Sequence, residues 1–510
     1  MAGPTVDSAM RDIAIGIDIG TTGVKAVAVT TSGEVVFEST RPHDLIAERS
    51  GFAEEDAEEW WESTKQILAE IASQVDCTRV VGLGFSGMVP ALVLVAQNGA
   101  PVRNSIQQND ARAVQEIAEF KALLDEQRYF GETGNSVNQQ VVFPKLRWMD
   151  RHEPDSLMQA AYLMGSYDYC AFRLTGVPAI ERNWALESGM WLIEEERWHD
   201  ELLQMIPLSP DLLPPVYATG EILGESSEAV ARETGFPAGV PVIAGIADHV
   251  ASALSTGVRS EGDLLLKLGG AGDVLYASDD LRLDPRMFID YHPFPGKFLI
   301  NGCMSAGGSI VKWITNLTQD TDFDRLTVEA ETRNLGDGQI IVLPYFLGEK
   351  TPIFDTDARG VIFGLSLNHD RAALFRAVLE AVAFGFRHHV DVLEEMGCGV
   401  RNVYLSNGGA RSPLWRQIVL DVIGSDGTYV PNHPGSCIGA AFAVLQNLVP
   451  SHESRALEAF LARGVAIRYS QEQHERYSHY YALYRDLYEQ LKPLFPRLHS
   501  TTRDWARRDI

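Results

Sequence analysis

The chain opens with apolar residues that recur at every second position. Residues 13–29 read IAIGIDIGTTGVKAVAV, in which β-branched residues alternate on either side of a turn of glycine and threonine. Period-two alternation around a short Gly-rich turn is typical of a β-hairpin. A third strand is predicted at residues 34–40, reached through Ser32-Gly33. The chain therefore begins with three successive strands.

The same pattern returns in the second half of the chain. Residues 264–268 run into a turn that reads GGAGD and leave it through residues 274–277. Both turns gather backbone N–H groups on glycine near one acid, and such groups form an anion-binding nest that suits phosphate. For either turn alone, an ordinary hairpin is the alternative. Two such hairpins favour a duplicated architecture, with one in each of two lobes that face each other across a cleft.

Longer segments carry apolar residues at helical spacing. Residues 369–396 form one amphipathic helix, and the tyrosine-rich residues 471–491 form another that packs on the body. Residues 162–175 are also helical in pattern. Because these helices alternate with strands along the chain, the pattern predicts an α/β fold.

Two aspartates stand where a predicted strand gives way to a turn or a helix. Asp18 opens the first Gly/Thr turn, and because a carboxylate repels phosphate, we interpret it as a direct or water-mediated ligand of Mg²⁺. Asp248 follows the predicted strand 242–244 in the sequence GIADH and precedes a helix of small residues. A carboxylate there is a candidate general base, and the alternative is an ordinary helix N-cap.

Three further segments have two readings each. Residues 82–87 read GLGFSG and match the dinucleotide fingerprint, but residues 91–96 predict another strand where that site needs a helix, which favours a coincidental match. The polar residues 103–113 form either a solvated loop or a set of partners for a polyhydroxyl ligand. The Gly-Gly turn after the strand 403–405 suits a stacked nucleobase or ribose as well as tight packing.

Composition narrows the class of function. The chain has 510 residues, which predicts two or three domains, and its 45% hydrophobic and 22% charged residues are those of a globular protein. A net charge of -26 argues against nucleic acid or an anionic membrane as a partner, although a local nest still suits an anionic small ligand.

Location is predicted from what the sequence lacks. Five scattered cysteines form no CxxC pair, which is typical of reduced thiols, and the first dozen residues carry no signal-peptide pattern. No apolar run reaches the length of a membrane span. We therefore expect a cytoplasmic protein.

Taken in order, these segments resemble the FGGY family of carbohydrate kinases, and within it the xylulokinase-like branch. The motifs that carry the resemblance read DIGTTGVK, FPKLRW, GIADH, PYFLGEKTP with DARG, and SNGGARSPLWRQ. Residues 360–380 also follow the second signature of the family, with Ala373 where a polar residue is usual. The resemblance extends from residue 13 to the tyrosine-rich final helix.

The resemblance implies two ribonuclease-H-like, actin-like α/β lobes that face a central cleft, with ATP and Mg²⁺ as cofactors. Residues 13–257 would form the N-terminal lobe, with the sugar site, the first phosphate motif and the catalytic base at its end. Residues 258–495 would form the nucleotide-binding C-terminal lobe with the C-terminal helix.

The resemblance also assigns residues, motif by motif. Asp18 would lie at the metal, and Asp248 would take the proton of a sugar hydroxyl during phosphoryl transfer. The nucleotide would be bound by Thr21, Thr22, Lys25, Gly269, Gly270, Gly272, Gly408, Gly409, Ala410 and Ser412. The sugar would be bound by Met88, Gln108, Asp110, Asp248 and His249.

The chain departs from the family pattern at several of these positions. The second phosphate turn has Gly-Gly-Ala where relatives have Gly-Thr-Ser, so a phosphate-facing hydroxyl is missing. Met-Val-Pro at 88–90 replaces Met-His-Gly, Gln108 replaces an aromatic residue, and His249 replaces asparagine. The last three positions contact sugar in relatives, so the sugar is left open among a ketopentose, a tetrose and a polyol.

Three functions fit these residues. The leading one is an ATP-dependent kinase that phosphorylates a hydroxyl of a small sugar or polyol, with a ketopentose of the xylulose or ribulose type expected. The second is an actin-like or chaperone-like ATPase, and the third is a catalytically weakened sugar sensor. The presence of Asp248 together with a polar loop favours the kinase, because a mechanical ATPase needs no polyol pocket. The oligomeric state is left open, with a homodimer as the expectation.

Overall fold

The chain divides into two compact units. The computed structural model describes residues 11–506 except 207, 320–321, 334–339, 432 and 451–453, with side chains described as far as residue 501. Unit 1 comprises Met1–Gly257, Ile289–Phe298 and Pro434–Ala462, and unit 2 comprises Val258–Phe288, Leu299–His433 and Arg463–Ile510. The predicted domains meet at the same residue, 257, but each is one continuous segment, whereas unit 1 is assembled from three.

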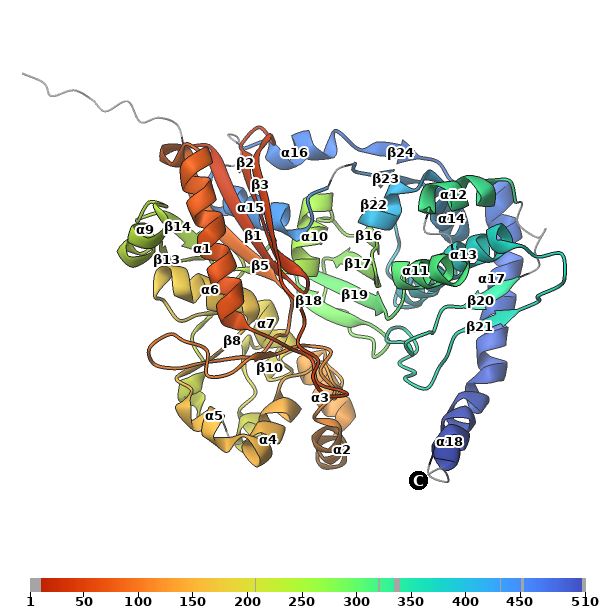
Figure 1. Ribbon diagram of the computed structural model, residues 1–510, viewed down its shortest axis with the longest axis horizontal. Helices are drawn as coiled ribbons and strands as arrows, with labels where there is room; N and C mark the ends of the chain where they lie inside the picture. Colours follow the sequence, from red (N-terminus) through yellow and green to blue (C-terminus); the bar gives the residue numbers. More distant parts are fainter. Residues whose placement is uncertain are drawn as a thin grey trace, which may run out of the picture. The chain divides into compact units, whose positions relative to one another are not determined.

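Unit 1 is built around a sheet whose strands run in the order β13-β14-β5-β1-β2-β3 (Figure 1). β15 also pairs with β5. The predicted hairpin is confirmed: β1 (Ile13–Gly20) pairs antiparallel with β2 (Gly23–Thr30), and β3 (Val35–Pro42) follows. β5 (Val80–Gly87) runs parallel to β1 and remains a strand through the whole GLGFSG sequence. No helix follows those glycines directly, so the segment is not a dinucleotide turn.

The other elements of unit 1 surround this sheet. Its further strands are β4 (Glu54–Glu55), β6 (Val93–Val95), β7 (Ser105–Ile106), β8 (Tyr162–Met164), β9 (Ile180–Glu181), β10 (Trp191–Leu192), β11 (Arg197–Trp198), β12 (Val216–Tyr217), β13 (Ile222–Glu225), β14 (Pro241–Ile243) and β15 (Ile246–Ala247). Its helices are α1 (Ala57–Gln74), α2 (Val114–Leu123), α3 (Glu126–Thr133), α4 (Phe143–His152), α5 (Pro154–Gln159), α6 (Ser166–Thr175), α7 (Arg182–Glu187), α8 (Asp200–Met205), α9 (Glu228–Thr234), α10 (Asp248–Thr256), α15 (Ser436–Leu448) and α16 (Ala456–Leu461). The predicted helix 162–175 is wrong at its start, since its first three residues form β8, which pairs with β6.

Helix α15 reaches unit 1 from late in the chain and packs directly on β1 and β5 (Figure 1). A methyl group on Gly16 of β1 would collide with the carbonyl oxygen of Cys437 and lie 2.6 Å from the backbone nitrogen of Ala441. A methyl group on Gly84 of β5 would lie 3.1 Å from the carbonyl oxygen of Ala440. Gly16 therefore lets the helix backbone approach the sheet at a distance that no larger residue allows, and Gly84 leaves little room for one.

We expect Gly16→Ala to lower the free energy of unfolding by at least about 2 kcal/mol, because the added methyl group would meet helix backbone, which cannot rotate away. Urea unfolding followed by circular dichroism would measure the change. Gly131→Ala is the matched control, because a methyl group at this exposed position of α3 meets nothing within 4 Å, and it should be neutral or stabilising. Equal stability of the two variants would contradict the close packing of α15.

Unit 2 is built around a sheet with strand order β19-β17-β16-β22-β23-β24. Its strands are β16 (Asp263–Leu268), β17 (Gly272–Ser278), β19 (Phe298–Met304), β20 (Ile341–Leu343), β21 (Val361–Phe363), β22 (Asn402–Ser406), β23 (Gly427–Tyr429) and β24 (Val465–Ile467). β18 (Phe288–Tyr291) belongs to unit 1 except for its first residue. Its helices are α11 (Gly308–Leu317), α12 (Phe323–Glu331), α13 (Arg371–Glu395), α14 (Pro413–Ile423), α17 (Gln471–Leu491) and α18 (Phe495–Ala506). The predicted second hairpin is confirmed as the antiparallel pair β16 and β17.

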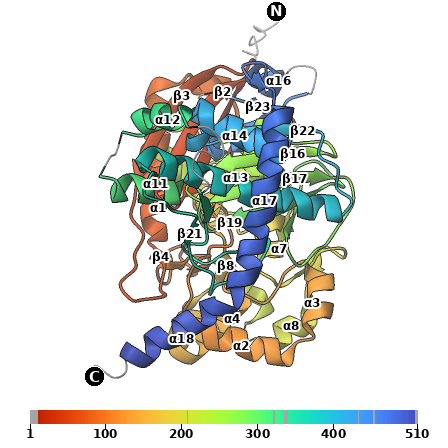
Figure 2. The ribbon, with the colours of Figure 1, turned by 90° about the vertical axis from the view of Figure 1, so that its right-hand side faces the viewer.

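The tyrosine-rich helix α17 packs on unit 2, as its pattern predicts (Figure 2). The Tyr484 ring lies 5.4 Å, between centroids, from Phe384 of α13, and its hydroxyl lies 2.9 Å from that of Tyr345. Tyr477 and Tyr488 are also buried. These tyrosines fill the interior of unit 2, so the predicted packing role is confirmed.

Candidate active site

Asp18 and Asp248 lie at the same edge of the unit 1 sheet. β1, β5 and β15 run parallel, and Ser86 of β5 stands opposite Asp18 on one side and Ile246 on the other. Asp248 comes two residues after Ile246, as the first residue of α10. The carboxyl ends of parallel strands are where α/β proteins bind ligands, and both candidate carboxylates lie at those ends.

Asp248 does not act as a helix cap. The N-cap position of α10 is Ala247, and no side chain forms the capping hydrogen bond. The N-cap alternative for Asp248 is therefore wrong. Its side chain is 36% exposed, which leaves the carboxylate accessible to a ligand, and its Oδ1 lies 3.3 Å from Nδ1 of His249.

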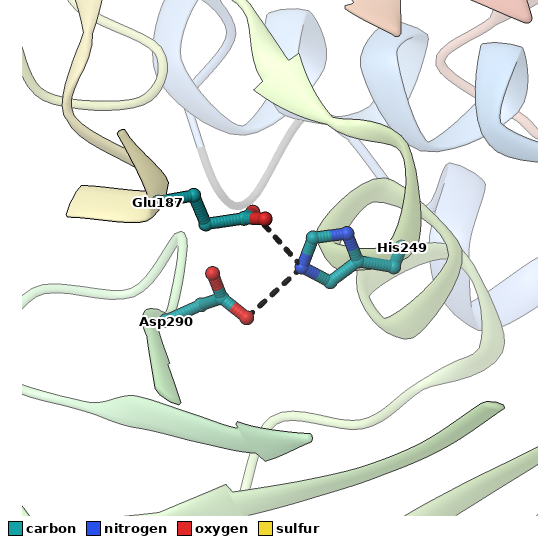
Figure 3. A group of neighbouring side chains, drawn as sticks. All are labelled: Glu187, His249 and Asp290. Carbon is teal, nitrogen blue, oxygen red and sulfur yellow. Dashed lines mark hydrogen bonds and ion pairs between the residues drawn. The ribbon is translucent and has the colours of Figure 1, made fainter. Parts of the chain in front are cut away.

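His249 lies within a cluster of carboxylates in unit 1 (Figure 3). Its Nε2 lies 2.9 Å from Oδ2 of Asp290 in β18 and 3.7 Å from Oε1 of Glu187 at the end of α7. The ligand atoms of these three residues all lie within 4.8 Å of one another. Burial and then the charge of Asp290 raise the pKa of Glu187 well above its usual range. The cluster therefore holds one buried and one partly buried carboxyl group around one imidazole.

The first glycine–threonine turn presents polar side chains to solvent. Thr21 and Thr22 connect β1 to β2 and are exposed, and Lys25 on β2 is exposed as well. Asp18 is only 9% exposed, and its Oδ1 accepts a hydrogen bond of 2.7 Å from the Ser86 hydroxyl. The turn therefore offers hydroxyls and an amine at its tip, while the carboxylate lies deeper.

The polar loop 103–113 is held by a buried ion pair. The guanidinium of Arg112 donates to both oxygens of Asp110 at 2.8 Å, and it stacks on Phe52 at 4.1 Å from the ring centroid. Asp110 also accepts a hydrogen bond of 2.6 Å from the Ala53 backbone N–H, and both members of the pair are buried. Asp110 therefore organises the loop, and the neighbouring Gln108 is half-buried at its surface. Met88, the remaining predicted sugar residue, is buried.

Lys145 of α4 forms hydrogen bonds with the backbone of the same loop. Its ammonium group donates to the carbonyl oxygens of Gln107 at 3.0 Å, Gln108 at 3.3 Å and Gln140 at 3.4 Å. The side chain is buried, and burial lowers the pKa of Lys145 from 10.5 to about 7. The charge of Asp110 opposes this shift without cancelling it.

This pKa predicts how stability depends on pH. Between pH 7 and 10.5 the folded state binds fewer protons at Lys145 than the unfolded state does, so raising the pH favours folding. Relative to Lys145→Met, we expect the free energy of unfolding of the unaltered protein to rise by about 2 kcal/mol between pH 7 and pH 9. Lys121→Met, which removes a lysine at an exposed position on α2, is the control for the loss of one positive charge. A flat difference for both variants would contradict the lowered pKa.

The glycine motifs of unit 2 serve partly as packing positions. The carbonyls of Gly269 and Gly270 accept hydrogen bonds from backbone N–H groups at the start of α11, at 2.7 to 3.0 Å. A methyl group on Gly272 would collide with Met304, whereas one on Gly270 meets nothing within 4 Å. The second glycine turn is therefore held by hydrogen bonds to the start of α11, and it has space for a ligand at Gly270.

The Gly-Gly turn after β22 also has one closely packed glycine and one open glycine. A methyl group on Gly409 would collide with the Trp415 ring, but one on Gly408 meets nothing within 4 Å. Ala410 is buried in the short 3₁₀ helix Gly408–Arg411, and the Ser412 hydroxyl caps α14 by accepting from the Trp415 N–H at 3.3 Å. Tight packing is thus confirmed for Gly409, and Gly408 is the open position of the turn.

Glu187 and Asp290 were missed by the sequence reasoning. Neither lies in a glycine motif, and each is far along the chain from His249. Asp290 is in an ordinary strand, FIDY, and Glu187 ends a helix of six residues. No local spacing signals that these side chains meet, so only the fold reveals the cluster.

The fold also places the chain among known proteins. The crystal structure of a xylulose kinase from Rhodospirillum rubrum aligns with a TM-score of 0.88 and 39% sequence identity, over 95% of this chain and 99% of that one. The two sheet-centred units therefore define the class, that of the sugar kinases with an actin-like ATPase fold. The predicted α/β fold class is confirmed.

Sequence comparison narrows the class to a family. Residues 13–255 match the N-terminal domain and residues 282–446 the C-terminal domain of the FGGY family of carbohydrate kinases. Xylulose kinase of Escherichia coli (strain K12) is 32% identical, over 94% of this chain and 99% of its own length, and that of Bacillus subtilis (strain 168) is 28% identical, over 95% and 98%. The chain belongs to the FGGY family of carbohydrate kinases.

Membership confirms the predicted resemblance and fixes the type of reaction. The protein is an ATP-dependent sugar kinase, a phosphotransferase with an alcohol group as acceptor, and its substrates are ATP and a small sugar. The alternative of a mechanical, actin-like or chaperone-like ATPase is therefore set aside. Among the described helices, none is both long enough and apolar enough to cross a bilayer.

Proposed function

We propose that this kinase transfers the γ-phosphate of MgATP to a hydroxyl of a pentulose, with Asp248 as general base. The similarity to xylulose kinases over nearly the whole chain supports a five-carbon ketose as acceptor. The observation that carries the catalytic part is the position of Asp248, which is accessible and not used as a helix cap at the carboxyl edge of a parallel sheet.

In the proposed reaction, Asp248 accepts the proton of the sugar hydroxyl as its oxygen attacks the γ-phosphorus. The bond between that phosphorus and the β,γ-bridging oxygen breaks, and ADP leaves with the electron pair. A neutral hydroxyl is a poor nucleophile, so a carboxylate within hydrogen-bond reach contributes about 10²–10⁴-fold to the rate. His249, whose ring contacts Asp248, is proposed to lie beside the sugar.

The residues at the first turn fit a hard cation. Asp18 supplies carboxylate oxygen at a strand end, beside the exposed hydroxyls of Thr21 and Thr22, and oxygen donors are what Mg²⁺ prefers. We propose that Asp18 would hold Mg²⁺, directly or through water, and that Thr21, Thr22 and Lys25 would bind phosphate. When bound, the ion would neutralise charge on the transferring phosphate.

The other predicted sugar and nucleotide residues are of two kinds: some are accessible to a ligand, and others are buried or closely packed. We propose that Gln108 contacts sugar directly, with Asp110 and Met88 shaping the pocket from buried positions. In unit 2 we propose that Gly270 and Gly408 face the nucleotide, because a side chain there would meet nothing. Gly269, Gly272, Gly409, Ala410 and Ser412 would fix the backbone that carries them.

The experiment that tests the proposal is release of ADP from MgATP in the presence of ketoses, aldoses and polyols of three to six carbons. We expect a large stimulation by one pentulose and little ATP hydrolysis without sugar. Stimulation only by a tetrose, a hexose or a polyol would overturn the assignment of a pentulose. ATP binding with no stimulation by any acceptor would support a sugar sensor instead.

The proposal also includes the oligomeric state of the protein and its location in the cell. We propose a homodimer, which light scattering would report as about twice the chain mass of 56.3 kDa. We propose a cytoplasmic location, supported by five free cysteines among the described residues. A monomeric mass would overturn the first part, and fractionation with a membrane or secreted pool would overturn the second.

A further inference from the structure

The ring of His249 joins Asp248 to two carboxyl groups that the sequence does not connect. Its Nδ1 faces Asp248 at 3.3 Å. Its Nε2 faces Asp290 at 2.9 Å and Glu187 at 3.7 Å (Figure 3). The titratable groups around the ring thus come from its own helix α10, from β18 and from α7. Both ring nitrogens face carboxylate oxygens, and only the doubly protonated ring can donate to both.

Burial limits the charge that this cluster can carry. The Asp290 side chain has no exposed surface, and those of His249 and Glu187 are 17% and 21% exposed. One imidazolium balances one carboxylate, so a second ionised carboxylate would remain uncompensated in a poorly solvated site. Protonation of Glu187 removes that charge, and its raised pKa agrees with this arrangement. Burial alone would lower the pKa of His249, but the charge of Asp290 and the hydrogen bonds to Asp248 and Asp290 raise it well above its usual range.

The backbone around Asp290 is fixed by the helix that carries Glu187. The Asn183 side chain of α7 accepts from the backbone N–H of Tyr291 at 2.7 Å and donates to its carbonyl oxygen at 3.1 Å. The Tyr291 hydroxyl donates to the carbonyl oxygen of Ile193 at 2.6 Å. Asn183 is fully buried, so α7 holds the strand segment that presents Asp290 in one position. This double hydrogen bond gives the cluster a rigid frame.

We infer that His249 is a positioning residue, an imidazolium held by Asp290 that donates its Nδ1–H to Asp248, with Glu187 as a neutral acid that completes the cluster. The inference deepens the proposed function and rests on Asp248 being the base. No proton leaves the imidazolium during turnover, since the sugar proton goes to Asp248. The donated hydrogen bond orients the Asp248 carboxylate and keeps it ionised to lower pH.

Two isosteric variants test whether Asp290 is the anion that holds the imidazolium and whether Glu187 is neutral. Asp290→Asn removes the anion that holds the imidazolium, so we expect kcat/KM to fall about 10-fold or more and the acidic limb of its pH profile to move to higher pH. Glu187→Gln replaces a neutral acid by a neutral amide, so we expect a smaller loss in kcat/KM than in Asp290→Asn and an unmoved acidic limb. The pair are matched, because each exchanges one carboxyl group of the cluster for an amide of the same shape.

Several results would overturn the inference. Equal losses in the two variants would mean that Glu187 is ionised or acts as a ligand. Stoichiometric metal in nucleotide-free protein that is absent from Glu187→Gln would identify a cation site. An unmoved acidic limb in Asp290→Asn would reduce Asp290 to a structural role.

A measurement on the unaltered protein tests the inference even if one of the two variants fails to fold. Ring nitrogen chemical shifts of His249, assigned by comparison with His249→Gln, should show an imidazolium at pH 7. A neutral ring at pH 7 would overturn the inference. Failure of the proposed function is distinguishable, because it would appear as near-normal turnover in Asp248→Asn whatever the result for Asp290.

Discussion

Replacing Asp248 by asparagine should lower kcat by about 10²–10⁴-fold, the range that a positioned general base contributes. The amide keeps the shape of the side chain and can still contact His249, but it cannot accept the proton of the sugar hydroxyl. Binding of ATP should persist, because none of the predicted nucleotide residues is altered. Steady-state ADP release and nucleotide titration would measure the two properties separately.

Asp155→Asn is the control for that experiment. It makes the same chemical change at an exposed position on α5, and it should leave both kcat and ATP binding unaltered. A kcat for Asp248→Asn within a few fold of the unaltered enzyme would remove Asp248 from the role of base. Loss of ATP binding together with turnover would indicate a structural defect.

Asp18→Asn should lower kcat by at least about 10²-fold and raise the concentration of Mg²⁺ required, because the ion supplies several kcal/mol of charge stabilisation in phosphoryl transfer. An amide oxygen carries no charge and binds a hard cation more weakly than a carboxylate does. Rates measured against free Mg²⁺ at saturating ATP would resolve both effects.

Ser86→Ala should lower kcat less than Asp18→Asn does. It removes the hydroxyl that donates to Asp18 at 2.7 Å and leaves the carboxylate in place, so a loss of about 10-fold is expected from its orienting role. If Asp18→Asn left the Mg²⁺ requirement unchanged, the metal would be bound elsewhere. A larger loss in Ser86→Ala than in Asp18→Asn would also contradict the assignment.

Much of the fold was predictable because its signals are local. The hairpin β1–β2 follows from period-two alternation around a glycine turn, and α17 follows from helical spacing over 21 residues. The start of the predicted helix 162–175 was wrong for a physical reason. Its first residues pair with β6, and a partner strand far along the chain outweighs their helical pattern.

The candidate site was predictable only where a motif marks it. Asp18 and Asp248 stand at strand ends that the sequence itself reveals, whereas Glu187 and Asp290 reach His249 from separate elements. Asp110 lies in a polar loop that suggested a ligand contact, and the sequence did not reveal that its carboxylate pairs with Arg112. A side chain's neighbours along the chain do not determine which charges it meets in the fold.

The three-part composition of unit 1 restricts how this enzyme can be divided. A polypeptide that stops at Gly257 holds the motifs of the N-terminal half, yet it lacks α15 and leaves the apolar faces of β1 and β5 bare. It would also lack Asp290, one of the carboxylate partners of His249. Split-gene complementation or exchange of halves between homologues should therefore fail at this border unless residues 289–298 and 434–462 travel with the first fragment.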